Sequence, residues 1–456
     1  MAAYTGTCPV SSARSHFGAQ FARCESEFAS ASPGWLAPVR RAAMKRFDEL
    51  GLPTRKDEAW KYTPTSQIGE AAFSLAPQSE IELSREDVIR IFGEPAADCS
   101  LVFANGRFAP SLSSTESLPE TVDASSLADV LRDDPERVQR TLALGADSLT
   151  RPFAALNLAF VRNGAFVSIG AGSTEQSIEL LFVTTRAAAG CVCNIRNIIR
   201  LEAGTTALIS MRYSSDLGVD TSRGNYLTNA VTSIELGEDA GLDLVSVQRE
   251  AEGAVHLSSI DVEQRRDSRF SSHLFAIGAG LSRSEVNSVL TAPGADCTLN
   301  GLFLVGGTQH VDNQTVIDHA SPNGTSRELY KGVLGGRSRG VFNGLVRVRP
   351  DAQKTDAQQS NPNLLVSDRA HVNTKPTLEI YADDVKCSHG STIGRLDQDA
   401  LFYMQARGLD ERTATQILIG AFASEITEAI PHESLRAGVH GWVTGKLDAV
   451  TSAEAA

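Results

Sequence analysis

Hydrophobic periodicity predicts short helices in the first part of the chain. In residues 36–50, apolar side chains recur at spacings of three and four, which is typical of one helix face, and Gly51 follows as a stop signal. Residues 84–93 have the same character, and Ser84 is placed to cap the helix N-terminus. A third and shorter helix is predicted over residues 124–131. We therefore expect a mixed N-terminal region with short helices.

From about residue 176 the pattern changes to short segments rich in Val, Ile, Leu and Phe, several of which alternate with polar residues. Turn signals interrupt these segments, for example at 202–206, 237–241 and 321–324. No helical stretch separates the segments for roughly 200 residues, which excludes a sheet built from βαβ units. A sandwich or barrel and a stacked β-helix both remain. The steady spacing and the scarcity of two-residue hairpin turns favour the β-helix.

Beyond Arg395 the pattern becomes helical again. Residues 397–408 predict a helix that is capped by Asp397. Residues 410–430 predict a second helix with a broad apolar face, which ends at Pro431. The tail is therefore expected to be a small helical module attached to the β core.

These patterns divide the 456 residues into three unequal parts. We expect an N-terminal mixed and helical region over residues 1–150, a β core over residues 151–395, and a C-terminal helical module over residues 396–456. A third helix, from residue 433 to about residue 450, completes the module.

Composition and charge narrow the class of protein. Hydrophobic residues make up 42% of the chain and charged residues 21%, so a large core is possible and extensive disorder is excluded. The net charge of −13 disfavours nucleic acid and anionic membranes as partners. No stretch approaches ~18 consecutive apolar residues, so no transmembrane helix is expected.

Cysteine usage points to a reducing compartment. The seven cysteines are odd in number and scattered, and a chain of this length needs no disulfide framework. The N-terminal segment lacks the continuous apolar stretch of a secretory signal. We therefore expect a cytoplasmic protein.

The pair Cys387 and His389 is the sharpest candidate for chemistry. In a strand, positions i and i+2 point to the same face, so a thiolate and an imidazole would lie side by side. Such a pair could bind zinc or ferrous iron, or act as an activated nucleophile. Two ligands are too few for a stable metal site, however. A half-buried cysteine beside a hydrogen-bonded histidine is the simpler interpretation of these residues alone.

A second polar cluster contains His310, Asp312 and His319, with Asp318 beside the last. Histidines and carboxylates at such spacing can ligate divalent metals, and a metal-dependent β-helix enzyme acting on an acidic or carbohydrate substrate would use them. The simpler interpretation is a polar rung and its turn. The sequence lacks the patterns GxxxxGKS, GxxxxGKT and HExxH, so autonomous ATP hydrolysis has no support.

Residues 55–63 mix aromatic with basic side chains. A nucleic-acid site would require a positive surround, which Asp57 and Glu58 cancel. The close pair Cys191 and Cys193 is placed poorly for a relaxed disulfide and is interpreted as buried, inert thiols. We interpret residues 55–63 as a structural junction or a docking surface for another protein.

Five segments form an ordered set of longer motifs. They are RKDEAWKYT at 55–63, HVDNQTVIDHASPNGTSRELYKGVL at 310–334, GVFNGLVRV at 340–348, AQKTDAQQSNPNLLVS at 352–367 and ADDVKCSHGSTIGRLDQDALFYMQARGL at 382–409. Together they resemble the SufB/SufD family of iron–sulfur cluster assembly proteins, over roughly residues 50–430. The chain is similar to the SufD branch of that family, because it carries the Lys56–Thr63 signature. It also has Gly390 after the Cys-x-His motif, where SufB-branch chains typically place a glutamate.

The resemblance implies a fold and a complex. The fold is a right-handed parallel β-helix core with an N-terminal helical region and a C-terminal helical module. The implied partners are a SufB-like paralogue and a SufC-like ABC ATPase, with a homodimer expected for the isolated chain. The implied role is non-enzymatic and supports iron acquisition and cluster formation at the SufB–SufD interface. A SufB-type scaffold is the alternative within the family.

The resemblance also assigns residues. His389, with Cys387 beside it, is linked to a transient iron or iron–sulfur site at the interface, and no cofactor or metal is expected to be bound stably by the isolated chain. The ATPase is expected to dock on the C-terminal module. Six residues there are the candidate contacts: Leu401, Phe402, Tyr403, Arg407, Ile417 and Phe422.

Overall fold

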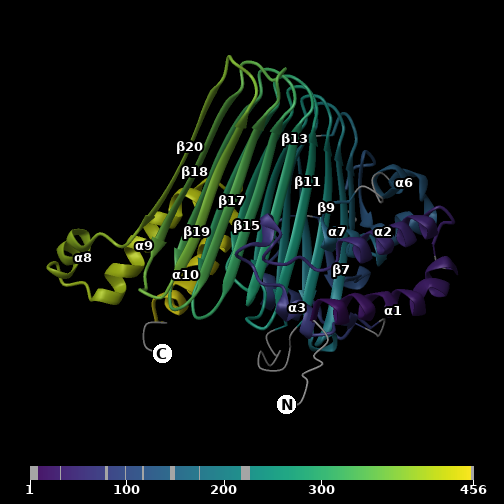
Figure 1. The fold of residues 1–456 in the computed structure, drawn as a ribbon, viewed down its shortest axis with the longest axis horizontal. Helices are drawn as coiled ribbons and strands as arrows, with labels where there is room; N and C mark the ends of the chain where they lie inside the picture. The colour runs from purple at the N-terminus through teal and green to yellow at the C-terminus, as the bar shows by residue number, and fades with distance from the viewer. Residues whose placement is uncertain are drawn as a thin grey trace, which may run out of the picture.

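Two long parallel sheets form the centre of the molecule. The computed structural model describes residues 9–30, 32–77, 81–97, 99–115, 118–143, 149–173, 175–216 and 226–452. Within these residues, consecutive strands alternate between two ten-stranded sheets, and most strands pair in parallel with the strand two places further along the chain (Figure 1). The chain therefore winds as a parallel β-helix, which confirms the predicted architecture.

The strands of both sheets follow the chain in order. The first sheet contains β19 (His371–Ile380), β17 (Arg339–Val348), β15 (His310–His319), β13 (Leu281–Leu290), β11 (Val255–Gln264), β9 (Leu227–Leu236), β7 (Cys191–Leu201), β5 (Ala165–Ile169) and β4 (Val122–Ser126), with β1 (Ser74–Leu75) beside β7. The second contains β20 (Lys386–Gly394), β18 (Asp356–Leu365), β16 (Thr325–Leu334), β14 (Asp296–Val305), β12 (Arg269–Ala276), β10 (Gly241–Arg249), β8 (Thr206–Ser215), β6 (Gln176–Thr184), β2 (Cys99–Ala104) and β3 (Arg107–Phe108). The pairs β2–β3 and β4–β5 are antiparallel and lie at the same end of the β-helix.

Alternate residues of each strand point inward and fill the space between the sheets. Apolar side chains from both sheets, such as Leu180 and Ile209 of the second sheet and Ile234 of the first, form one continuous core. Because parallel strands pair in register, like side chains stack from rung to rung. The rings of Phe103, Phe182 and Tyr213 stack in this way, with centroids 5.1 and 4.7 Å apart.

The turns between the sheets stack as well. At one corner, successive rungs place Asp239, Asp267, Gly294, Asn323 and Lys354 in the left-handed region, with φ between 55° and 78°. Each donates its backbone N–H to a carbonyl of the next rung's turn. Gly, Asn and Asp are the residues that adopt this conformation at least cost, which explains the turn signals in the sequence. These positions recur about 27 to 31 residues apart, so the repeat is too long and too loose to read as a motif.

Helices of the N-terminal region cover the outer face of the first sheet at one end of the molecule (Figure 1). They are α1 (Pro9–Ser30), α2 (Leu36–Leu50), α3 (Ser66–Glu70), α4 (Arg85–Phe92), α5 (Leu127–Asp133), α6 (Glu136–Ala143) and α7 (Pro152–Ala159), of which α4 lies on the second sheet. Every residue from Phe153 to Ala159 is buried, because α7 lies between the sheet and α2. Helices 36–50 and 84–93 are confirmed, the second with the predicted capping box.

The predicted helix over residues 124–131 is partly wrong. Residues 124–126 belong to β4, which pairs with β5, and the helix begins only at Leu127. Ser126 marks this boundary, because its side chain accepts a hydrogen bond from the Asp129 backbone N–H. The alternating pattern of β4 was too short to be distinguished from the apolar spacing of the helix that follows. Helix α1 was not identified from the sequence.

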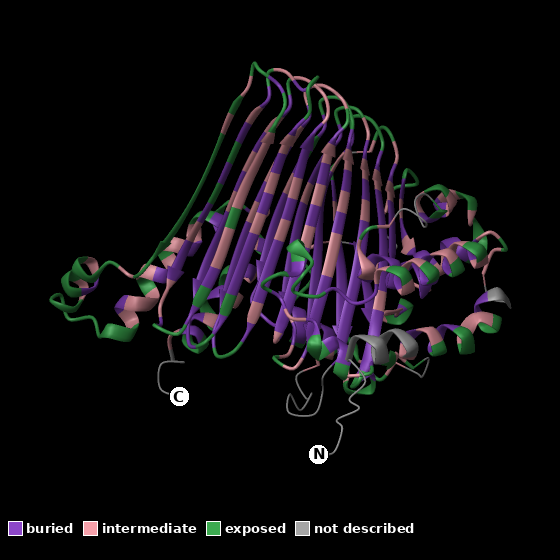
Figure 2. Ribbon diagram, in the orientation of Figure 1, coloured by how far each residue is buried: buried purple, intermediate pink, exposed green. Residues whose placement is uncertain are grey.

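Three helices follow the last strand: α8 (Gln398–Gln405), α9 (Glu411–Glu428) and α10 (Glu433–Ser452). The predicted caps Asp397 and Asp410 both accept backbone hydrogen bonds. Apolar residues of α9 and α10 pack on the outer face of the second sheet, whereas α8 projects away from the body (Figures 1 and 2). Among the helices of the described residues, none combines the length and apolar character that spanning a membrane requires.

The aromatic stack gives a first prediction. Replacing Phe182 by Ala leaves a cavity between Phe103 and Tyr213, and we expect the free energy of unfolding to fall by about 3 to 5 kcal/mol. Chemical denaturation of the isolated chain measures the change. The matched control is Phe402→Ala, because Phe402 is 72% exposed and its removal should cost about 0.5 kcal/mol or less. Equal costs for both variants would contradict the role of the stack.

Candidate functional site at the open end of the β-helix

The last rung of the β-helix is open. Among the described strands, β20 pairs only with β18 and β19 only with β17, so one edge of each sheet is free. Figure 2 shows β20 as an exposed strand along almost its whole length. Three large apolar side chains are exposed here: Ile380 (40%), Tyr381 (62%) and Ile393 (53%). A free edge with exposed apolar groups is a surface that another strand can cover.

Cys387 and His389 lie on this last strand and point toward the interior side. Cys387 pairs in register with Ala357, and His389 pairs with Gln359. Both partners are buried, whereas Gln358, which lies between the partners on β18, is exposed. Residues that pair in register in a parallel sheet point to the same face. The two candidate ligands therefore share a face, as predicted, and they border the mouth of the β-helix where no further described rung covers them.

The local environments of the two side chains differ. Cys387 is half-buried and packs with Val346, Ala357 and Ala382, while His389 is exposed. Burial raises the pKa of the Cys387 thiol above its usual value. Cys387 is thus a thiol at neutral pH, and it must lose a proton when it binds a metal ion.

The ligand set is incomplete within the chain. Positions 387 and 389 are separated by about 6.6 Å along the strand, close enough for both side chains to reach one ion or one cluster. No group of three or more His, Cys, Asp or Glu side chains that could hold a metal was found in the part of the chain that the structure describes. A side chain added at Gly390 would meet no atom within 4 Å, but this position pairs with the exposed Ser360 and so points to the face opposite to the pair.

A polar column lies directly behind His389. Gln359 of β18 and Glu328 of β16 occupy the same register position on successive strands, both facing the interior. Gln359 Nε2 donates to Glu328 Oε2 over 2.6 Å. Burial raises the pKa of Glu328 to about 7, against the opposing effect of hydrogen bonds from Thr315 and Gln359. Sequence reasoning missed both residues. A signal was present for Glu328, because the other inward positions of β16 are small or apolar, whereas β18 also places the amides Asn361 and Asn363 at inward positions.

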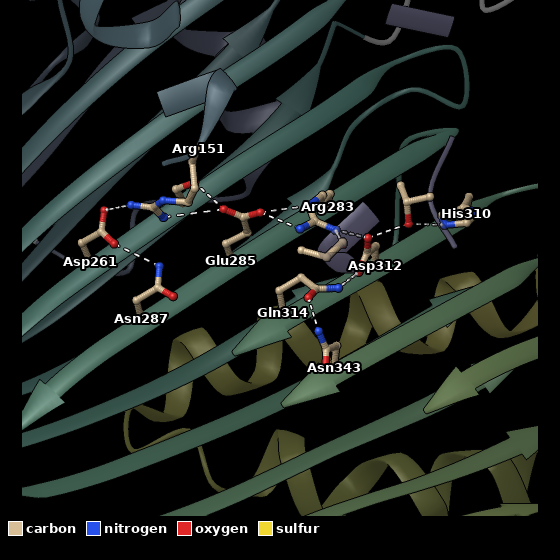
Figure 3. A network of polar contacts seen from close by, with 12 residues as sticks. Arg151, Asp261, Arg283, Glu285, Asn287, His310, Asp312, Gln314 and Asn343 are labelled. Carbon is tan, nitrogen blue, oxygen red and sulfur yellow. Dashed lines mark hydrogen bonds and ion pairs between the residues drawn. The ribbon is translucent and has the colours of Figure 1, made fainter. Parts of the chain in front are cut away.

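The second polar cluster does not form one site. Thr63 Oγ1 donates to Asp312 Oδ2 over 2.5 Å and lies 3.0 Å from His310 Nε2 (Figure 3). His319 lies at the far end of the same strand, about 30 Å away, where its Nε2 is 2.9 Å from Ser326 Oγ. Burial lowers the pKa of His319 to about 4, so it is neutral. The arrangement needed for a metal-dependent enzyme, with all three residues on one ion, is therefore absent from this cluster.

His310 and Asp312 instead help to fasten residues 55–63 to the first sheet. Arg283 forms hydrogen bonds with Asp312 and Glu285, and its guanidinium lies 3.9 Å from the centre of the Trp60 ring. Figure 3 shows how this network continues through Glu285 to Arg151 on the N-terminal region. The segment is thus a structural junction, which was one of the two interpretations of its sequence.

The other cysteines carry no comparable site. Six cysteines lie in the described residues and all are unpaired, while Cys8 lies outside them. Cys191 and Cys193 are buried, and burial raises the pKa of Cys193 to about 12. A thiol with such a high pKa is a poor nucleophile and a poor metal ligand.

Residues 336–340 read Gly-Arg-Ser-Arg-Gly and so match the GxSxG pattern of a nucleophile elbow, but they form a turn between β16 and β17. Ser338 is fully buried, and its Oγ donates to the Val305 carbonyl over 3.4 Å. A hydrolase elbow requires an exposed serine on a strand-to-helix turn. This serine has neither the exposure nor the setting.

The candidate contacts on the C-terminal module divide into two groups. Phe402, Tyr403 and Ile417 are exposed by 72, 57 and 45% of their surface, and Arg407 lies over the Tyr403 ring at 4.4 Å. Leu401 is buried, and Phe422 packs at the β core with Lys331 Nζ 4.7 Å from its ring centre. Only the first group forms a surface that a partner could reach directly.

Glu328 gives a second prediction. Its folded-state pKa of about 7 lies above the ordinary value of 4.5, so the native state favours the protonated acid. Its contribution to stability is complete below pH 4.5 and is lost as the pH rises through 7. We expect Glu328→Gln to stabilise the chain by on the order of 3 kcal/mol at pH 8 and by little at pH 4.5.

Thermal or chemical denaturation across this pH range measures the effect of Glu328→Gln. The control is Glu120→Gln, which makes the same substitution at an exposed position. A difference between wild type and Glu328→Gln that stays constant with pH would show that the buried carboxyl does not titrate in this range.

Comparison with known proteins places most of the chain among proteins of one system. Residues 182–422 match the family model described as the SUF system FeS cluster assembly, SufBD core domain. Residues 11–180 match the model of the SufBD protein N-terminal region. The two matches adjoin each other and include the open rung and the start of the C-terminal helices.

Individual relatives agree with these matches. The chain is 32% identical over 405 residues to an iron–sulfur cluster assembly SufBD family protein of Synechocystis sp., covering 88% of this chain and 89% of that protein. It is 30% identical over 407 residues to the iron–sulfur cluster assembly protein SufD of Escherichia coli, covering 88% and 90%. A second SufBD family protein of the same Synechocystis strain is 23% identical over 329 residues, covering 68% and 65%.

Proposed function

Because the chain belongs to the SufBD family of iron–sulfur cluster assembly proteins, we propose that it works as the SufD-type subunit of a cluster assembly complex. Its partners in this proposal are a SufB-like paralogue and a SufC-like ABC ATPase. The observation that carries the proposal is the open last rung, where Cys387 and His389 border a mouth that no further described strand covers. There the subunit supports iron acquisition and cluster formation.

The chemistry of the pair favours a site shared between chains. A thiolate and an imidazole suit iron, and iron–sulfur clusters are held by cysteines with histidine as an occasional replacement. Such clusters need about four protein ligands, and Cys387 and His389 supply two at most. A second β-helix that extended the free edges of β19 and β20 would cover Ile380 and Ile393 and bring its own ligands to the mouth. Iron is then a substrate passed through this interface.

The SufD type is favoured over the SufB-type scaffold by two observations. The chain is 30% identical, over 88% of its length, to a relative that is named SufD. Gly390 also follows the Cys-x-His motif at the position where SufB-branch chains typically place a glutamate, so this chain has no carboxylate there. Without its paralogue, a second copy of the chain would occupy the open rung as a homodimer.

The C-terminal module is the proposed docking site for the ATPase. The chain has no phosphate-binding GxxxxGKS or GxxxxGKT motif, so nucleotide hydrolysis would come from a partner. Phe402 and Tyr403 on the projecting helix α8 present the aromatic, exposed surface that protein interfaces use as anchors. We place the complex in the reducing cytoplasm, in keeping with the unpaired cysteines of the described residues.

The proposed site predicts the behaviour of His389→Ala. Because His389 is exposed, its removal should leave stability unchanged while it lowers maturation of an iron–sulfur reporter enzyme by about tenfold or more. Complementation of a strain that lacks this subunit measures maturation. The matched control is His371→Ala, since His371 is also exposed but begins β19 on the outer face. Normal maturation by His389→Ala would remove the site and leave only the scaffold role.

The proposed docking surface predicts a selective loss of one partner. The double variant Phe402→Asp, Tyr403→Asp should reduce co-purification of the ATPase by roughly tenfold or more, while the SufB-like paralogue is retained. The control is Tyr62→Asp, because Tyr62 is exposed to a similar extent but lies on the N-terminal segment. Failure of the wild-type chain to co-purify with either partner under anaerobic conditions would overturn the proposed function as a whole.

A further inference from the structure

Three residues in one column connect the interior of the β-helix with the candidate site. Glu328 pairs in register with Gln359, and Gln359 pairs in register with His389. Adjacent strands lie about 4.8 Å apart, so side chains in neighbouring positions of such a column can form hydrogen bonds. The bond between Gln359 Nε2 and Glu328 Oε2 is one of these, at 2.6 Å.

The amide of Gln359 is only half satisfied. Gln359 is 3% exposed, and its Oε1 has no hydrogen-bond partner in the part of the chain that the structure describes. Leaving a buried carbonyl oxygen without a partner costs about 1 to 3 kcal/mol. Such groups in native proteins usually indicate a missing partner, and the next group along this column is the imidazole of His389.

The surroundings hold the amide in one position. Its Nε2 is bound to Glu328, which leaves Oε1 as the free end of the group. On the opposite sheet, a side chain at Gly344 would come within 2.2 Å of Gln359 Nε2 and 3.0 Å of Thr315 Oγ1. The absence of a side chain at position 344 therefore makes the room that the amide occupies. An apolar residue at 359 would have filled the same space without an unsatisfied polar atom.

We propose that Gln359, held by Glu328, is a positioning residue for His389, and that its Oε1 accepts the N–H of the imidazole nitrogen that does not bind iron. A histidine that binds a metal usually donates its other ring N–H to a carboxylate or a carbonyl oxygen. That bond fixes the tautomer and the orientation of the ring, and it makes the ligating nitrogen more basic. The inference rests on the proposed function, since it concerns the same histidine, and it adds the group that prepares the histidine for its ligand.

The column gives a reason for the burial of Glu328, although burial destabilises its charged form. A glutamine whose amide could rotate freely would present either its oxygen or its nitrogen to His389. Glu328 accepts from Nε2 and so selects the orientation in which the oxygen is free. The three side chains then form a carboxylate–amide–imidazole series that runs from the buried core to the exposed mouth.

The direct test is the ring tautomer of His389. In the full chain labelled with ¹⁵N-histidine, we expect His389 to show one dominant tautomer with a hydrogen-bonded N–H, its signals being assigned by their loss in His389→Ala. In Gln359→Met, which keeps the volume but removes the acceptor, the ring should show the tautomer mixture of a solvent-exposed histidine. Maturation of the reporter enzyme should fall by about tenfold.

A second variant, in which the residues at 328 and 359 are exchanged, controls for loss of folding. In the double variant Glu328→Gln, Gln359→Glu, the amide at 328 can donate to the carboxylate at 359, whose other oxygen remains available to His389. We expect this variant to restore both the single tautomer and the reporter activity that Gln359→Met loses. If Gln359→Met does not fold, the swapped pair alone decides, because a folded swapped pair with a mixed tautomer would overturn the inference.

The two proposals fail in different ways. Wild-type tautomer and wild-type maturation in Gln359→Met would overturn the positioning role and leave the function of His389 intact. Normal maturation in His389→Ala would overturn the site itself, whereas the tautomer of His389 in the isolated chain would still show whether the hydrogen bond exists. Thermal denaturation of each variant separates both outcomes from unfolding.

Discussion

In-register pairing between successive rungs is the constraint on which the whole structure depends. Every strand of the core repeats the inward and outward positions of its neighbour, so each interior side chain has one neighbour above it and one below it. The stack of Phe103, Phe182 and Tyr213 is one result. The ladder of left-handed turn residues, in which Asp267 bonds to one rung and Asn323 to another, is a second. Because of this constraint, the orientation of a residue on an exposed strand can be deduced from its buried partner.

The two ends of such a stack are not equivalent in this chain. At one end the antiparallel strands β3 (Arg107–Phe108) and β4 (Val122–Ser126) terminate the sheets, and the N-terminal helices pack beside them. At the other end β19 and β20 have free edges, and Tyr381 and Ile393 are exposed. Free edges promote uncontrolled association unless they are covered. This difference between the two ends supports the proposal that another chain completes the open end and supplies further ligands to the candidate site.

The sequence predicted most of the elements, because helix caps and turn residues act locally. Ser84, Asp397 and Asp410 each mark a helix start that the structure confirms. Contacts between rungs are different, since they join residues about 30 positions apart through a register that the sequence does not state. For this reason the polar residues of β15 could be interpreted as one metal cluster, although His310 faces outward and His319 faces the interior.

The same limitation applied to the site itself. Cys387 and His389 could be placed on one face from their spacing, but the break in alternation near Ala382 hid which face it was. The structure shows that a turn separates β19 from β20 there, so the two strands belong to different sheets and the alternation restarts. Only the pairing of His389 with Gln359 then shows that the histidine borders the interior.

Polar groups inside a hydrophobic core usually lower stability. Their positions in the core of this β-helix therefore suggest a role other than folding. The interior of the earlier rungs is filled largely by aliphatic and aromatic side chains, while near the open end Glu328 is buried and Gln359 Oε1 lacks a hydrogen-bond partner among the described residues. Burial holds the pKa of Glu328 near 7, so the charged form is destabilised in the physiological range. Glu328 and Gln359 lie in register with His389, and poorly packed polar residues scattered through the core would not show this alignment. A column that ends at His389, an exposed histidine on the edge strand β20, is better explained by what it does to that imidazole than by any contribution to folding.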